Sequence, residues 1–195
     1  VGVVFSPRLS AAARARAADR SVSAQVDFLP GDVETLHMDN GSFDAIICEC
    51  AFCTFPDKAA AARGFNRVLK PGGGIGVSDL TRTGALDVRL NTLLAWVACV
   101  ADARPAADYA AILTAAGLVV DAPERHDEVL DTIAEDVHLK LMGAEILQKL
   151  GKATLPPGLE LEEVKALARS ASAAIRAGNL GYAVILAHKP QSDLG

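Results

Sequence analysis

The chain has 195 residues, of which 51% are hydrophobic and 5% aromatic, and its formal net charge is −5. This length suits one domain whose sizeable core is built mainly from small aliphatic side chains. The acidic balance argues against nucleic acid as the main partner, because phosphate binding needs clustered Lys and Arg. We expect neither a membrane-spanning helix nor a signal peptide, since no apolar run approaches the roughly 18 residues that a span requires.

Apolar runs typical of strands alternate along the chain with amphipathic patterns typical of helices. Strands are predicted over residues 1–5, 24–29 and 43–47, from a turn at 69–73 to Asp79, from Leu118, and over 182–187. Helices are predicted over residues 8–20, from Asp57 to Leu69, and over 86–100, 107–116, 127–150 and 160–177. Ser6 and Asp57 can cap helices. A strand, a helix and a second strand in this order predict a parallel sheet, and hence an α/β fold.

The two long helices before the last strand form an insertion. We expect the core to comprise residues 1–126 and 180–190, and the helical insertion to comprise residues 127–179. The insertion is interpreted as a lid or a dimerisation arm.

The chain begins directly in a strand, at Val1. A doubly wound sheet places its first strand at the centre, with the ligand-binding loop just after it. If residues 1–5 are the second strand, the first strand and its glycine-rich loop lie upstream. We therefore expect the sequence to be incomplete at its N-terminus.

Five short blocks carry a resemblance to a known family. In chain order they are GVVFSP (2–7), GDVE (31–34), DNGSFD (39–44), RVLKPGG (67–73) and AAGL (115–118). Together they resemble the class I S-adenosylmethionine-dependent methyltransferases, in particular the ubiquinone/menaquinone C-methyltransferases and the arsenite methyltransferases. Each block alone is unspecific, but five in the right order and spacing are specific. The resemblance implies a Rossmann-like, doubly wound, mostly parallel sheet and S-adenosylmethionine as cofactor.

The resemblance also implies contacts with the cofactor. Asp32 would accept a hydrogen bond from the adenine amino group, and Val33 would offer its backbone N–H to the ring. Val4 and Phe5 end the strand on which family members carry an acidic residue that holds both ribose hydroxyls. Val4 stands at that position here, and an apolar side chain cannot make the charge-assisted contact.

Three of the four cysteines crowd together after the third predicted strand, as C-x-C-x-x-C. Ligands bind at this edge of open α/β sheets. The resemblance implies that Cys48 and Glu49 lie beside the methionine end of the cofactor, and we assign Cys50 and Cys53 to the substrate. Cys99 also belongs with the substrate, because its segment is similar to one in which an arsenite methyltransferase cysteine binds trivalent arsenic. Thiolates suit such a soft centre.

Two other interpretations of these cysteines are a structural role and zinc binding. Free cysteines are usually small buried hydrophobes. A metal site is not expected, because neither paired C-x-x-C knuckles nor a nearby His complete a tetrahedral zinc set.

The sequence therefore predicts S-adenosylmethionine-dependent methyl transfer to a small-molecule acceptor, for which a thiol-binding metalloid is one candidate. One alternative is a non-catalytic, methyltransferase-like scaffold for binding or dimerisation, which Val4 favours. Another is a nucleotide-dependent oxidoreductase, which the turn at 69–73 disfavours. The free thiols indicate a reducing, cytoplasmic location, and a homodimer is a further expectation.

Overall fold

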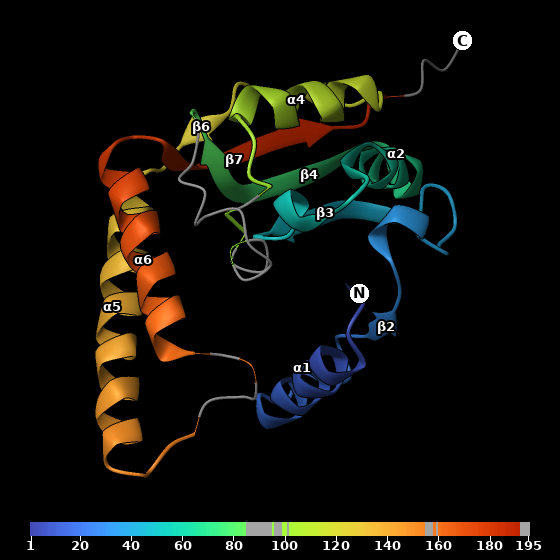
Figure 1. Cartoon of the computed structure of the whole chain (residues 1–195). Helices are drawn as coiled ribbons and strands as arrows, with labels where there is room; N and C mark the ends of the chain where they lie inside the picture. The colour runs from blue at the N-terminus through green and yellow to red at the C-terminus, as the bar shows by residue number, and fades with distance from the viewer. Residues whose placement is uncertain (85–94, 96–98, 101, 155–157, 159, 192–195) are drawn as a thin grey trace.

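A computed structural model describes residues 1–84, 95, 99–100, 102–154, 158 and 160–191 of the chain (Figure 1). The described strands form two sheets. The smaller sheet pairs β1 (Gly2–Val4) with β2 (Phe28–Pro30) in parallel. The larger sheet has the order β3-β4-β7-β5, with β6 also paired to β7. Its strands are β3 (Phe43–Glu49), β4 (Leu69–Arg82), β5 (Val119–Val120), β6 (Glu124–Arg125) and β7 (Leu180–His188).

The carboxyl ends of β3 and β4 lie at the same edge of the larger sheet, because these two strands are parallel. β3 runs parallel to β4, while β7 runs antiparallel to β4, β5 and β6. Glu49, at the end of β3, pairs with Ser78, so that Asp79 on β4 follows at the same level. The α/β architecture with a mostly parallel sheet agrees with the prediction.

Two helices, α2 (Lys58–Val68) and α4 (Ala106–Ala115), pack together against one face of this sheet. Rows of paired residues such as Cys48, Val77 and Ile185 point into that core and are almost inaccessible to solvent. Aromatic rings fill its centre, with the centroids of Phe52 and Tyr109 5.5 Å apart in an edge-on contact. Buried apolar surface of this kind is the main stabilising contribution to the fold.

The predicted helix caps are confirmed. The hydroxyl of Ser6 accepts a hydrogen bond from the Leu9 N–H at 3.4 Å at the start of α1 (Pro7–Asp19), which packs on β1 and β2. The Asp57 carboxylate accepts one from the Ala60 N–H at 2.8 Å at the start of α2. Both side chains satisfy a backbone donor that the helix itself leaves unpaired.

The opposite face of the larger sheet is open along a second row of paired residues. Ile47 on β3 pairs with Gly76 on β4, which in turn pairs with Leu186 on β7. The side chains of Ile47 and Leu186 are 85% and 46% exposed. Within the described part of the chain, β3 has a strand partner on one side only. The sheet therefore presents an apolar face and an unpaired strand edge together.

Within residues 127–179, α5 (Glu128–Lys149) and α6 (Leu161–Arg176) form a helical hairpin, which extends away from one end of the sheet (Figure 1). An ion pair between Lys165 and Glu145 joins the two helices. Their inner faces share a second apolar core with Leu130 and Leu180. None of the helices in the described ranges has the length and apolarity that crossing a membrane requires.

Some predicted elements differ in detail. The turn at residues 69–73 lies inside β4 as a bulge, because the pairing moves from Phe43–Leu69 directly to Ala45–Gly74. Gly72 has a φ of +77° there, a conformation that L side chains rarely adopt. The second strand is shorter than predicted, β6 was not predicted, and the helix predicted over residues 86–100 lies largely outside the described residues.

Candidate functional site

The carboxyl ends of β3 and β4 meet beside a buried carboxylate, that of Asp79. Asp79 on β4 is 1% exposed. Its Oδ2 accepts a hydrogen bond from the backbone N–H of Cys53 at 2.8 Å, and its Oδ1 accepts one from that of Leu80 at 2.8 Å. Cys53 belongs to the short helix η2 (Phe52–Thr54), so the carboxylate fixes this turn to the end of β4.

Two thiols lie next to this carboxylate. The sulfur atoms of Cys53 and Cys99 and a carboxylate oxygen of Asp79 are all within 4.8 Å of one another. A hydrogen bond from the Cys53 thiol lowers the pKa of Cys99 below its ordinary value. That same contact, together with burial and the Asp79 charge, raises the pKa of Cys53. Cys99 is therefore the thiol of this pair that ionises more readily.

Cys50 lies next to this pair of thiols. The Cys99 thiol donates a hydrogen bond to the backbone oxygen of Cys50 at 3.3 Å. The Cys50 sulfur lies 3.7 Å from the hydroxyl of Tyr182 on β7, and burial raises the pKa of the Cys50 thiol. Cys50 and Cys99 both have positive φ angles, of 46° and 65°. Non-glycine residues in this region are uncommon and concentrate at functional sites.

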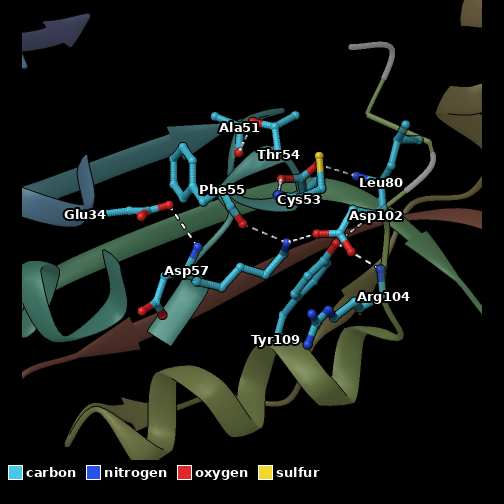
Figure 2. A network of polar contacts seen from close by, with 12 residues as sticks. Glu34, Ala51, Cys53, Thr54, Phe55, Asp57, Leu80, Asp102, Arg104 and Tyr109 are labelled. Atoms are coloured by element: carbon cyan, nitrogen blue, oxygen red, sulfur yellow. Dashed lines mark hydrogen bonds and ion pairs between the residues drawn. The ribbon is translucent and has the colours of Figure 1, made fainter. Parts of the chain in front are cut away.

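A polar network holds the segment after Cys99 against the core (Figure 2). Lys58, whose side chain is 2% exposed, forms an ion pair with Asp102. The Tyr109 hydroxyl accepts a hydrogen bond from the Arg104 N–H at 3.0 Å and donates one to the Leu80 carbonyl at 3.3 Å. Because these contacts connect α2, α4 and β4 to residues 102–104, they fix the position from which Cys99 approaches the site.

The residues assigned to the nucleoside part of a cofactor lie on the first half of the chain. Asp32 is exposed and caps the short helix η1 (Val33–Thr35), where its Oδ1 accepts a hydrogen bond from Glu34 N–H at 2.9 Å. Val33 packs partly against the main core. Val4 ends β1 and is half-buried, whereas the adjacent Phe5 side chain is 82% exposed.

The two residues assigned to the methionine end of the cofactor, Cys48 and Glu49, lie in different environments. Glu49 is exposed at the end of β3, but the Cys48 side chain points into the core beneath α2. Burial raises the pKa of the Cys48 thiol to about 12. The structure therefore brings together Cys50, Cys53 and Cys99, and leaves Cys48 apart from them.

Sequence reasoning missed two contributors to this site. Tyr182 was assigned only to a strand, and Lys58 was assigned only to a helix. A tyrosine in an otherwise aliphatic final strand was the one available signal, because a buried hydroxyl usually needs a partner. Nothing local distinguishes Lys58 from an ordinary solvent-exposed lysine.

Comparison with known proteins shows which class the chain resembles. Residues 1–77 match the family model described as a methyltransferase domain. Over 137 residues the chain is 28% identical to the arsenite methyltransferase of Halobacterium salinarum, covering 69% of this chain and 34% of that protein. Over 82 residues it is 41% identical to the ubiquinone biosynthesis O-methyltransferase of Xanthomonas oryzae pv. oryzae, covering 42% of this chain and 34% of that protein. The matched part thus spans about a third of the length of these curated relatives.

Solved structures of the same architecture extend over nearly the whole chain. The [4+2]-cyclase SpnF superimposes with a TM-score of 0.72 at 25% identity, covering 98% of this chain and 66% of that one. Phosphoethanolamine N-methyltransferase 2 of Haemonchus contortus, solved with S-adenosyl-L-methionine, gives a TM-score of 0.75 at 18% identity, covering 97% and 43%. The fold is that of the Rossmann-like methyltransferases. With the family match over residues 1–77 and the curated relatives, it shows that this chain is similar to the class I S-adenosylmethionine-dependent methyltransferases.

Proposed function

We propose that this chain is part of an enzyme that transfers the methyl group of S-adenosylmethionine to a small molecule centred on a thiophilic metalloid, such as trivalent arsenic. The observation that supports the proposal is the close pair of thiols of Cys53 and Cys99 at the carboxyl edge of β3 and β4, with Cys50 adjacent to Cys99 through its backbone oxygen. Ligands of open α/β sheets bind at this edge.

The thiols suit a soft trivalent centre. When a thiol meets a trihydroxy metalloid, a sulfur–metalloid bond forms, a metalloid–oxygen bond breaks, and the thiol proton leaves with the hydroxide as water. Cys99 reacts first, because its lowered pKa gives it more of the nucleophilic thiolate form. We assign the second sulfur to Cys50, because the hydrogen bond from the Cys99 thiol to its backbone oxygen makes the two residues neighbours.

The nucleoside-binding residues fit S-adenosylmethionine in part. One carboxylate oxygen of Asp32 caps η1, so the other can accept a hydrogen bond from the adenine amino group. Glu49, exposed at the end of β3, lies where the methionine end is expected. Val4 offers no group for the ribose hydroxyls. We propose that residues upstream of Val1 complete the site, because among the described residues β3 has a strand partner on one side only and the nearby Ile47 side chain is 85% exposed.

Positioning is the main contribution of the protein to the reaction. When bound, the cofactor supplies a methyl group on a sulfonium sulfur, and that carbon–sulfur bond breaks as the acceptor's lone pair forms the new bond to carbon. The thiols, once bonded to the metalloid, would fix the direction in which its lone pair points. Holding both reactants in line can supply roughly 7–11 kcal/mol of the barrier, and no dedicated acid or base is required.

The α5–α6 hairpin, within the insertion over residues 127–179, is proposed as the lid that excludes water from this reaction. It packs on Leu80 and Tyr182, and the Tyr182 hydroxyl touches Cys50. The dimerisation role is the alternative, and it is supported by exposed apolar side chains along α5, namely Leu139, Met142 and Ile146. The cytoplasmic location stays a prediction, supported by four unpaired thiols.

A non-catalytic scaffold is the second candidate function. Val4 favours it, since an apolar side chain replaces the expected ribose ligand. The [4+2]-cyclase among the structural neighbours is named for a reaction other than methyl transfer, so this fold also serves other chemistry.

Transfer of a labelled methyl group from S-adenosylmethionine to trivalent arsenic, in a version extended by the upstream residues, tests the proposal. Product is expected with the wild type and with Cys48→Ala, and a loss of at least tenfold with Cys50→Ala or Cys99→Ala. If neither substitution changes the rate of transfer, the proposal that thiols bind the acceptor is contradicted. No transfer to any acceptor would favour the scaffold.

A further inference from the structure

We infer that Cys53, Asp79 and Cys99 form a binding site for a thiophilic divalent cation of the Zn²⁺ or Cd²⁺ type. This site differs in ligands and in charge from the proposed metalloid site, although both use Cys99. The inference does not depend on methyl transfer.

The geometry of the three ligand atoms is already close to that of a coordination sphere. They lie within 4.8 Å of one another. In a tetrahedral zinc site, with Zn–S bonds of about 2.3 Å, neighbouring ligands are about 3.8 Å apart. Small rotations of the two cysteine side chains span the difference. Three protein ligands leave the fourth position open to water or to a small ligand.

The carboxylate gives the second argument. Asp79 is 1% exposed, and among the described residues no basic side chain forms an ion pair with it. Its two hydrogen bonds come from the uncharged backbone N–H groups of Cys53 and Leu80. A buried charge is costly unless it is paired or coordinates a metal. A cation between Asp79 and the two sulfurs would meet this charge directly.

The ligand types select the cation. Two sulfurs and one carboxylate oxygen favour Zn²⁺ and Cd²⁺ over Mg²⁺ or Ca²⁺, which prefer all-oxygen sites. Binding replaces the thiol protons with metal–sulfur bonds and releases those protons to solvent. The site was not predicted from the sequence because Asp79, on β4, lies 26 residues from Cys53, which belongs to η2.

The backbone orients the ligands before any cation binds. The Cys53 N–H is held by Asp79 itself at 2.8 Å, so one ligand positions another. Cys99 is held by its hydrogen bond to the Cys50 oxygen and by its positive φ of 65°. Ligands already held close together lose less conformational freedom when the metal binds.

Titration of Cd²⁺, followed by the ultraviolet charge-transfer absorption of thiolate–cadmium bonds, tests the inference on the chain as it stands. The wild type is expected to bind one equivalent. Cys53→Ala and Cys99→Ala should each weaken binding by more than about tenfold, since even removing a supporting hydrogen bond at a metal site costs that much. Asp79→Asn should weaken it as well. Cys48→Ala, which removes a buried thiol outside the group, is the matched control.

Cys50→Ala separates the two proposals. It should leave Cd²⁺ binding within about twofold of wild type while weakening the binding of a trivalent arsenical such as phenylarsine oxide. Far-ultraviolet circular dichroism checks that each variant is folded, and the cysteine variants decide the test if Asp79→Asn is not. The inference is overturned if Cd²⁺ does not bind stoichiometrically, if Cys53→Ala binds it normally, or if Cys48→Ala weakens it equally.

Discussion

The backbone N–H of Cys53 donates a hydrogen bond to Oδ2 of Asp79 at 2.8 Å, in the interior of the protein. This contact joins the turn after β3 to the end of β4, and it therefore sets the distance between the thiols and the sheet. The other oxygen of Asp79 holds the Leu80 N–H. One carboxylate thus satisfies two backbone donors that would otherwise be unpaired in the core.

Replacing Asp79 with Ala should lower the free energy of unfolding by roughly 2–4 kcal/mol, because two buried N–H groups lose a charged acceptor. Asp79→Asn should cost less, since the amide oxygen can still accept one hydrogen bond. Urea denaturation measures both. Asp44→Ala is the control, because that carboxylate is exposed and pairs with Lys70 on the surface; an equal loss in the two alanine variants would contradict the account.

The ion pair between Lys58 and Asp102 should respond unequally to removal of its two members. Asp102→Ala leaves the buried Lys58 ammonium without its carboxylate and should cost up to about 3 kcal/mol. Lys58→Met should cost less, because Asp102 is 37% exposed and water can solvate it. Thermal or urea unfolding of the two variants decides the order. The exposed pair Lys140–Asp136 on α5 is the reference and should contribute about 0.5 kcal/mol or less.

Alkylation by iodoacetamide should reveal the order of thiol ionisation. The thiolate is the reactive form, so a lowered pKa allows Cys99 to react at a lower pH than Cys50, whose pKa is raised by burial. Cys48, with a pKa of about 12, should react after both. Peptide mass spectrometry across a pH series gives the order.

The Cys53→Ala variant checks the cause of that order. It removes the hydrogen bond that stabilises the Cys99 thiolate, so the pH midpoint of Cys99 alkylation should rise. The Asp79 charge also faces Cys99, and it disfavours the thiolate in both proteins. An unchanged or lower midpoint would show that Cys53 does not stabilise the thiolate.

Most elements of the fold could be predicted because their signals are local. Ser6 and Asp57 stand where helix caps are required, and the α5 and α6 patterns repeat every three or four residues. The polar pair Glu124–Arg125 carries no strand pattern, and its pairing with β7 depends on a partner almost 60 residues away. Only tertiary structure creates that strand.

The candidate site was predictable only as a position in the sheet. The C-x-C-x-x-C spacing placed thiols at the carboxyl edge of β3, which is where Cys50 and Cys53 lie. Sequence spacing could not reveal that Cys48 faces the core, since that depends on which face of the strand the helices cover. The contact between Asp79 and Cys53, and the burial of Lys58, arise from packing between distant segments.

Substitution of Ile47 should distinguish this chain from a version extended upstream. In the present chain Ile47→Ala should cost about 0.5 kcal/mol or less, because the side chain is 85% exposed. If upstream residues cover this face, the same change should cost about 2–5 kcal/mol in the longer version. Ile75, which is 3% exposed, provides the matched control, since Ile75→Ala should be costly in both.

Calorimetric titration of S-adenosylmethionine and S-adenosylhomocysteine, into this chain and into the version extended upstream, tests the central claim most directly. We expect the longer version to bind both with one site per chain, and Asp32→Ala to weaken binding by roughly tenfold, the value of one hydrogen bond to a charged group. The present chain should bind weakly or not at all. Absence of binding to either version would contradict the methyltransferase assignment of the site and favour a non-catalytic scaffold.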